Sequence, residues 1–267
     1  MPSGSAPRAY PTGMEAGRSW KQQARTASAE RSVSWKIFCW RQRMKNKIWD
    51  VVQPVLFFFL CIIAVTAVGM SIASFALNIN IMNYQALTEK VRALPLYLSA
   101  SYYALVMILM RKAFQADQMR FGYGSCRWKA WQVLLAVLAV AAAGFLWSSV
   151  LTGSGLENVF RYYRINAAGA FDGQKAVPLI LATVILGPPA EEMIFRGMVY
   201  RRARAYWGTK KALLLSSVLF GVYHGNMIQF LYAVVIGLML GWIYEKSGSL
   251  KVSIAAHMCV NLLAVFL

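Results

Sequence analysis

The sequence predicts an all-α protein, a polytopic bundle of about seven transmembrane helices with an intramembrane polar cavity. Of the 267 residues, 58% are hydrophobic and the mean hydropathy is +0.48, whereas soluble domains contain about 45–50% apolar residues. Several apolar runs approach the roughly 20 residues that a membrane-spanning helix needs. The few ionisable side chains within these runs gather in the last four of them. Because such groups are costly in hydrocarbon, they indicate a polar cavity.

The apolar runs give the expected helices in chain order: about 51–79, 94–111, 130–151, 176–204, 210–225, 227–244 and 251–267. We expect the fourth to be interrupted at Pro188-Pro189, because proline removes a helical hydrogen bond and clashes with the preceding turn. The fifth is short for a full crossing. Gly237 and Gly241, four residues apart in the sixth, predict close packing against a neighbouring helix.

Residues 1–43 differ from the rest of the chain. They are rich in Ser, Ala, Gly, Arg and Gln and contain eight Lys/Arg and two Glu, a composition typical of disorder. We therefore expect a basic, disordered N-terminal extension at 1–43, followed by a membrane domain at 44–267. An alternative is that translation starts at Met44, where a short basic segment leads into the first apolar run. That run begins too late for a cleavable signal peptide.

The charge pattern predicts the orientation in the membrane. The chain has 28 Lys+Arg against 10 Asp+Glu, a net charge of +18, and cytoplasmic loops retain Lys and Arg. With seven helices, the N-terminal arm, the segment 111–129 and the segment 201–211 fall on one side. This places the N-terminus in the cytoplasm and the C-terminus outside. Short loops and the lack of a soluble domain suggest a bacterial plasma membrane, and no RNA- or DNA-binding motif accompanies the charge, so no nucleic-acid partner is expected.

The first polar motif lies in the fourth apolar run, Gly187-Pro-Pro-Ala-Glu-Glu-Met-Ile-Phe-Arg-Gly197. Proline suits the first turn of a helix, so we expect Glu191 and Glu192 in a first turn, where the helix dipole favours negative charge. Glu192 and Arg196 are four apart and can form an ion pair, which leaves Glu191 free to face elsewhere. The alternative is that all three residues form only a structural ion-pair cluster.

Two further motifs contain the only two histidines. Phe220 and His224 lie one helical turn apart, as do His257 and Asn261, so each pair shares a helix face. His224 could instead be an interfacial histidine at a helix end. His257 and Asn261 could instead join helices by hydrogen bonds.

Together these groups suit the hydrolysis of a peptide bond by water. A carboxylate and a histidine can activate water as a general base, and a second histidine and an amide can donate hydrogen bonds to an oxyanion. No Gly-x-Ser-x-Gly motif occurs. We expect no cofactor, with zinc as the alternative: Glu191, His224 and His257 would be a suitable ligand set with an open fourth position, although no HExxH motif is present.

The three motifs, Glu-Glu-x-x-x-Arg, Phe-x-x-x-His and His-x-x-x-Asn, resemble the CPBP family. This is the family of type II CAAX prenyl endopeptidases and bacteriocin-processing or immunity proteins, also called Abi. The resemblance covers about residues 176–267, the expected catalytic core. Typical extensions are Phe195-Arg196-Gly197, Gln229 and Ser247-Gly-Ser-Leu250. The extension at 1–43 is not a family feature, and no segment beyond Asn261 is expected to bind substrate.

The resemblance implies a role for each motif residue. Glu191 would be the catalytic base that activates water, assisted by His224, while His257 and Asn261 would form the oxyanion site. Glu192 and Arg196 would support the first motif. The implied substrate is a peptide or protein, membrane-associated or lipidated, and in prenyl-processing members it is a C-terminal tripeptide beyond a lipidated cysteine. Exported peptides and leader sequences are alternatives.

Two other functions use the same residues. A catalytically silent relative would act as an immunity or binding protein, but such a relative often loses a Glu or His, and here every motif residue is present. A transporter or proton channel would use Glu and His as a relay, but that class often shows inverted repeats and paired broken helices. No repeat is visible in this sequence.

Overall fold

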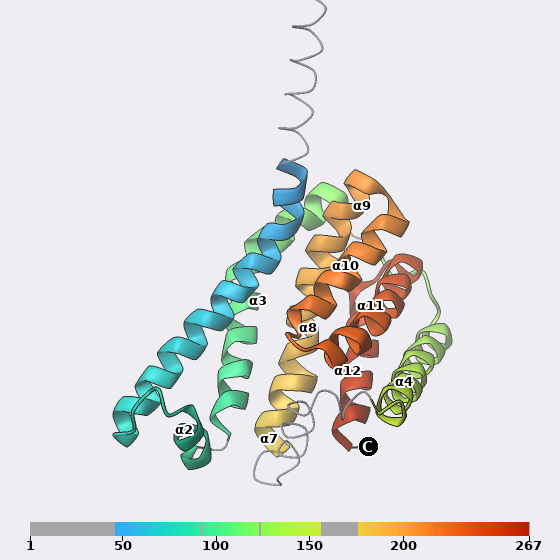
Figure 1. The fold of residues 1–267 in the computed structure, drawn as a ribbon. Coiled ribbons are helices and arrows are strands. Elements are labelled where there is room, and N and C mark those ends of the chain that lie inside the picture. Colours follow the sequence, from blue (N-terminus) through green and yellow to red (C-terminus); the bar gives the residue numbers. More distant parts are fainter. Residues whose placement is uncertain (1–45, 92, 123, 156–175, 267) are drawn as a thin grey trace, which may run out of the picture. The chain divides into compact units, whose positions relative to one another are not determined.

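The computed structural model describes residues 46–91, 93–122, 124–155 and 176–266. Residues from Asp50 onward form one compact unit. The extension predicted at 1–43 lies outside the described residues. Within the described ranges the regular structure is entirely helical (Figure 1). Five helices are long and apolar enough to cross a membrane, so the predicted polytopic helical bundle is confirmed.

The described residues form eight helices when contiguous segments are counted together. Seven are long and match the predicted runs: Asn46–Leu77, α3 (Leu94–Phe121), α4 (Ala130–Gly153), Ala176–Trp207, α10 (Thr209–Tyr223), α11 (Met227–Ser247) and α12 (Leu250–Phe266). The eighth, α2 (Tyr84–Lys90), was not predicted. The long helix Ala176–Trp207 comprises α7 (Ala176–Leu179), η2 (Ile180–Leu186), α8 (Gly187–Ile194), η3 (Phe195–Tyr200) and α9 (Arg201–Trp207). Of these, η2 and η3 are π-helical.

Helix α3 extends ten residues beyond its predicted end at 111. The apolar run stops at Arg111, but the backbone stays helical to Phe121 and ends at Gly122, which has a φ of 71°. The polar last turns are anchored, since Asp117 pairs with Arg202 of α9 at 2.6 Å. Part of the segment predicted as a basic loop is therefore helix.

Two helices are shorter than a full crossing. Helix α10 has 15 residues, which is about 22 Å at the helical rise. Helix α12 has 17 residues, or about 26 Å. A hydrocarbon core is about 30 Å thick, so the prediction that the fifth spanning segment is short is confirmed.

Charged side chains join three helix ends at one end of the bundle. Asp50, near the start of the first helix, contacts Arg120 of α3 at 3.3 Å and Arg202 of α9 at 3.4 Å. Arg202 also pairs with Asp117. These contacts bring together helix ends that carry basic residues, as the charge pattern predicts.

The helix Ala176–Trp207 is more enclosed than the outer helices. In its most apolar window 61% of residues are buried, against 22% in Asn46–Leu77 and 17% in α4. The outer helices expose large apolar side chains, among them Leu60, Ile63, Phe75, Ile108, Leu134, Leu138 and Leu146. The motif Glu-Glu-x-x-x-Arg is therefore carried by an inner helix, and the apolar outer surfaces suit contact with lipid.

The predicted glycine packing is confirmed between α10 and α11. A Cβ atom placed on Gly237 would lie 3.1 Å from the Cα of Ser217, and one on Gly241 would lie 2.7 Å from Leu213 Cδ2. At Gly237 the obstacle is backbone, which cannot move away as a flexible side chain can. The two helices can approach this closely only because residue 237 has no side chain.

Substituting Gly237→Ala is expected to lower the free energy of unfolding by about 1–3 kcal/mol, the usual cost of overpacking. Titration with SDS in mixed micelles would measure the change. The control is Gly153→Ala, since a Cβ there meets nothing within 4 Å. Equal stability of the two variants would contradict the assigned role of Gly237.

Candidate active site

The two prolines of the first motif do not break their helix. The chain remains helical from Ala176 to Trp207, so the predicted interruption is wrong. Pro188 has no N–H to donate, and the turn before it widens instead: the N–H of Gly187 donates to the carbonyl of Ala182, five residues back. The π-helical turns of η2 thus absorb the prolines without ending the helix.

Glu191 and Glu192 lie in the second turn of α8, not in its first. The segment begins at Gly187, with Pro188 and Pro189 in its second and third positions and no acidic residue in the first turn. The predicted stabilisation by a helix N-terminus is therefore wrong, because this segment continues an existing helix. The two carboxylates must be stabilised by side chains from other helices.

The widened turn leaves a backbone acceptor for Asn261. The carbonyl of Thr183 would normally receive the N–H of residue 187 or 188, but Gly187 donates to Ala182 and Pro188 has no N–H. Asn261 Nδ2 donates to this carbonyl at 2.7 Å. Pro188 thus leaves the Thr183 carbonyl without a backbone donor, and this carbonyl orients Asn261.

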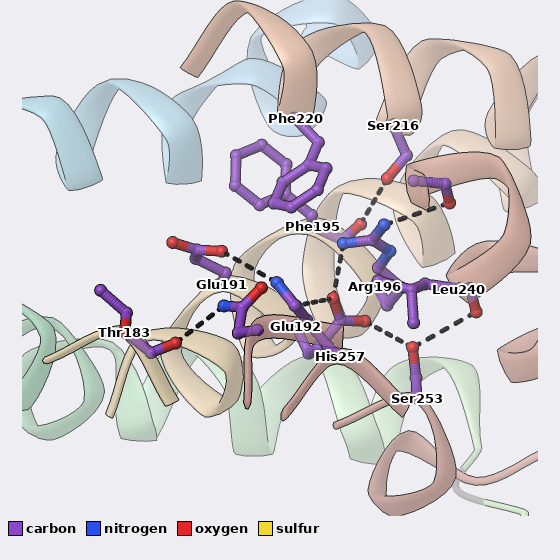
Figure 2. Close-up of polar contacts among 12 residues, drawn as sticks. Thr183, Glu191, Glu192, Phe195, Arg196, Ser216, Phe220, Leu240, Ser253 and His257 are labelled. Carbon is purple, nitrogen blue, oxygen red and sulfur yellow. Dashed lines mark hydrogen bonds and ion pairs between the residues drawn. The ribbon is translucent and has the colours of Figure 1, made fainter. Parts of the chain in front are cut away.

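Glu192 is the centre of a buried polar cluster. Its Oε1 accepts a hydrogen bond from Arg196 Nη1 at 2.7 Å and lies 3.0 Å from His257 Nδ1. Its Oε2 accepts a hydrogen bond from Ser253 Oγ at 2.5 Å (Figure 2). Glu192 is fully buried and Arg196 is 1% exposed. The predicted Glu192–Arg196 ion pair is confirmed.

Arg196 connects this cluster to two other helices. Its Nη2 donates to the carbonyl of Gly237 at 3.1 Å, and its guanidinium carbon lies 4.6 Å from the centre of the Phe220 ring. These contacts come from α11 and α10, and a guanidinium can make both because it is planar and has several donors. Arg196 therefore fixes the position of the Glu192 carboxylate.

Glu191 has different surroundings from Glu192. It is 4% exposed, its Oε1 accepts a hydrogen bond from the hydroxyl of Tyr103 at 2.7 Å, and its Oε2 lies 3.7 Å from His257 Nε2. The His257 ring thus lies between the two carboxylates (Figure 2). Glu192 faces a fixed cation, while Glu191 faces a neutral hydroxyl and an imidazole.

His224 lies beside this group at the end of α10. Its Nδ1 is 2.8 Å from the carbonyl of Phe220, which fixes the ring. Phe220 contacts both histidines edge to face, with ring centres 4.9 Å from His224 and 5.6 Å from His257. The described residues thus bring Glu191 and both histidines into one region, with Asn261 held separately on Thr183.

Helix α12 presents a polar stripe to the helix Ala176–Trp207. The stripe consists of Ser253, His257 and Asn261, which are spaced four residues apart. Ser253 contacts Glu192, and His257 contacts both Glu191 and Glu192. Asn261 contacts Thr183. Sequence reasoning missed Ser253. The signal was present, because Ser253 lies one turn before His257 on the same face.

Tyr103 and Tyr223 were also missed. Tyr223 OH donates to Tyr103 OH at 3.1 Å, and Tyr103 OH donates to Glu191. A tyrosine in the middle of an apolar helix needs a partner for its hydroxyl, which was a signal that Tyr103 has a polar neighbour. The sequence could not identify that neighbour, since it lies 88 residues away along the chain.

Zinc was the alternative to a mechanism without a cofactor. In the part of the chain that the structure describes, no group of three or more His, Cys, Asp or Glu side chains is arranged to hold a metal ion. Because His257 Nδ1 and His224 Nδ1 face Glu192 and the Phe220 carbonyl, a metal ion would have to bind at their Nε2 atoms.

Part of the chain matches a known protein family. Residues 173–263 match the model of the Rce1-like type II CAAX prenyl endopeptidases. This segment is similar to that family. It includes all three motifs and the polar stripe of α12. The structural elements before it, including α3 with Tyr103, lie outside the match.

Two proteins of Bacillus subtilis (strain 168) are similar to the chain. One, named "Putative membrane peptidase YdiL", is 33% identical over 137 residues, which is 48% of this chain and 54% of that protein. The other, named "Uncharacterized protein YpbD", is 31% identical over 93 residues, 35% of this chain and 46% of that protein. The chain thus spans about half the length of these curated relatives. No solved structure matches it.

Proposed function

We propose that this protein is an intramembrane endopeptidase in which Glu191 activates the attacking water. The supporting observation is the contrast between the two adjacent glutamates. Arg196 and Ser253 donate hydrogen bonds to the two carboxylate oxygens of Glu192, so this carboxylate has a structural role. Glu191 is held by a neutral hydroxyl, and a carboxylate can accept further hydrogen bonds. It can therefore take a proton from water.

The proposed reaction needs one water and forms no covalent bond between the protein and the substrate. Glu191 removes a proton from water as the oxygen attacks the carbonyl carbon of the scissile peptide bond. The proton is later delivered to the leaving nitrogen when the tetrahedral intermediate collapses. His224 assists Glu191 by orienting the water, and its ring is held in place by its bond to the Phe220 carbonyl.

His257 and Asn261 are the proposed oxyanion donors. The Asn261 amide has two N–H groups, and one is directed to Thr183, so the other can face a substrate oxygen. The carboxylate of Glu192 accepts hydrogen bonds, so His257 Nδ1 donates to it. Nε2, 3.7 Å from Glu191 Oε2, is then the ring atom left to face the oxyanion.

We propose a peptide substrate that is membrane-associated or lipidated, because the site lies on an inner helix of a membrane bundle. The relatives in Bacillus subtilis and the basic helix ends support a bacterial plasma membrane as the location. We propose that the start of the first helix faces the cytoplasm, since basic residues gather at that end of the bundle.

Cleavage of a peptide library by the purified protein in detergent tests the proposal. We would compare wild type with Glu191→Ala and His224→Ala, with and without a strong chelator. The matched control is Glu89→Ala, which removes an exposed carboxylate in contact with Gln85. We expect cleavage by wild type and the control in chelator, and loss of cleavage in both site variants.

Two other outcomes would point elsewhere. Cleavage that stops with chelator and returns with zinc would assign Glu191, His224 and His257 as metal ligands. A wild-type protein that cleaves nothing, in a library that includes lipidated C-terminal peptides, would favour the silent relative.

A further inference from the structure

We infer that Tyr103 is a positioning residue for Glu191 and that Tyr223 acts through it. This inference rests on the proposed role of Glu191 as the base. Tyr103 belongs to α3 and lies outside the residues that match the endopeptidase family. A helix without any of the three motifs would then supply part of the active site.

The hydrogen-bond directions follow from the chemistry of the partners. An ionised carboxylate only accepts, so the single hydrogen of the Tyr103 hydroxyl goes to Glu191 at 2.7 Å. The Tyr103 oxygen can then accept from Tyr223 at 3.1 Å. A hydroxyl that accepts one hydrogen bond becomes a stronger donor in the next. The Tyr223 hydroxyl thus strengthens the bond from Tyr103 to Glu191.

Aromatic packing fixes both rings. Phe58 of the first helix stacks on Tyr223 with ring centres 4.8 Å apart and contacts Tyr103 at 6.0 Å. Tyr103 is 8% exposed, and Phe58 is fully buried. Because the rings are held by neighbours on other helices, the Tyr103 hydroxyl has little freedom to leave the carboxylate.

The bond orients the carboxylate without neutralising it. Tyr103 occupies Oε1, which leaves Oε2 on the side of His257. An arginine in place of Tyr103 would hold the group by charge and reduce its ability to accept a proton. A phenol holds it by a neutral hydrogen bond, so Glu191 is fixed in direction and still able to act as a base.

Kinetics of Tyr103→Phe test this inference, using a peptide that wild type cleaves and Glu191→Ala does not. The ring packing is kept and only the hydroxyl is lost. We expect kcat to fall about tenfold or more, the equivalent of one hydrogen bond to a charged group. KM should change less than about twofold, because Tyr103 orients the base and does not bind substrate. The control is Tyr97→Phe, which removes a hydroxyl from an exposed residue of the same helix.

A double-mutant cycle separates positioning from general stability. Tyr223→Phe should lower kcat in the wild-type background and have almost no effect in the Tyr103→Phe background, because its path to Glu191 is already cut. Additive losses in kcat, or an unchanged kcat in Tyr103→Phe, would overturn the inference and leave Glu191 as the base. Cleavage that survives Glu191→Ala would instead overturn the proposed function, and the inference with it.

Discussion

Replacing Glu191 by glutamine is expected to lower kcat by about 10²–10⁴-fold, the usual contribution of a general base. The amide keeps the shape of the side chain and an oxygen that can accept from Tyr103, so the fold should be unaffected. What is lost is the ability to take a proton from water. Turnover of a cleaved peptide, with thermal unfolding in the same detergent, would measure both properties.

The neighbouring position supplies the contrast. Glu192→Gln removes the negative charge that faces Arg196 at 2.7 Å and His257 at 3.0 Å. We expect it to lower the thermal stability clearly, whereas Glu191→Gln should not. A Glu191→Gln protein that keeps kcat within tenfold of wild type would show that another group activates the water.

The helices were predictable because a membrane imposes a simple rule on the sequence. Each long helix of the described residues coincides with an apolar run that approaches the thickness of the bilayer. The rule fails where a helix leaves hydrocarbon. The last turns of α3 are polar, and they stay helical because Asp117 meets Arg202, a residue 85 positions later in the sequence. Apolar length cannot report such a contact.

The site was predictable where its contacts are local in sequence. Glu192 and Arg196 are one turn apart, so their ion pair followed from spacing alone. The bond from Asn261 to Thr183 could not be foreseen, because it depends on a carbonyl that Pro188 leaves without a donor in a widened turn. Proline was instead expected to break the helix. That expectation did not allow for π-helical turns, which continue the helix although proline donates no hydrogen bond.

Replacing Arg196 by methionine is expected to lower the free energy of unfolding by about 3–5 kcal/mol, the usual cost of removing one partner of a buried ion pair. The Glu192 carboxylate would remain fully buried without the guanidinium at 2.7 Å. Titration with SDS in mixed micelles would measure the loss. The matched control is Arg204→Met: Arg204 pairs with Glu245 at 3.0 Å but is 53% exposed, and exposed pairs contribute about 0–1 kcal/mol.

A second substitution shows whether the loss comes from the stranded carboxylate. In Glu192→Leu/Arg196→Met both charges are gone, and an apolar pair of similar volume often restores stability. We therefore expect the double variant to be more stable than Arg196→Met alone. It should still be inactive, because His257 and Ser253 lose the carboxylate that orients them. A double variant as unstable as the sum of the two single variants would show that Arg196 acts mainly through Gly237 and Phe220. The ion pair would then contribute little to the stability of this site.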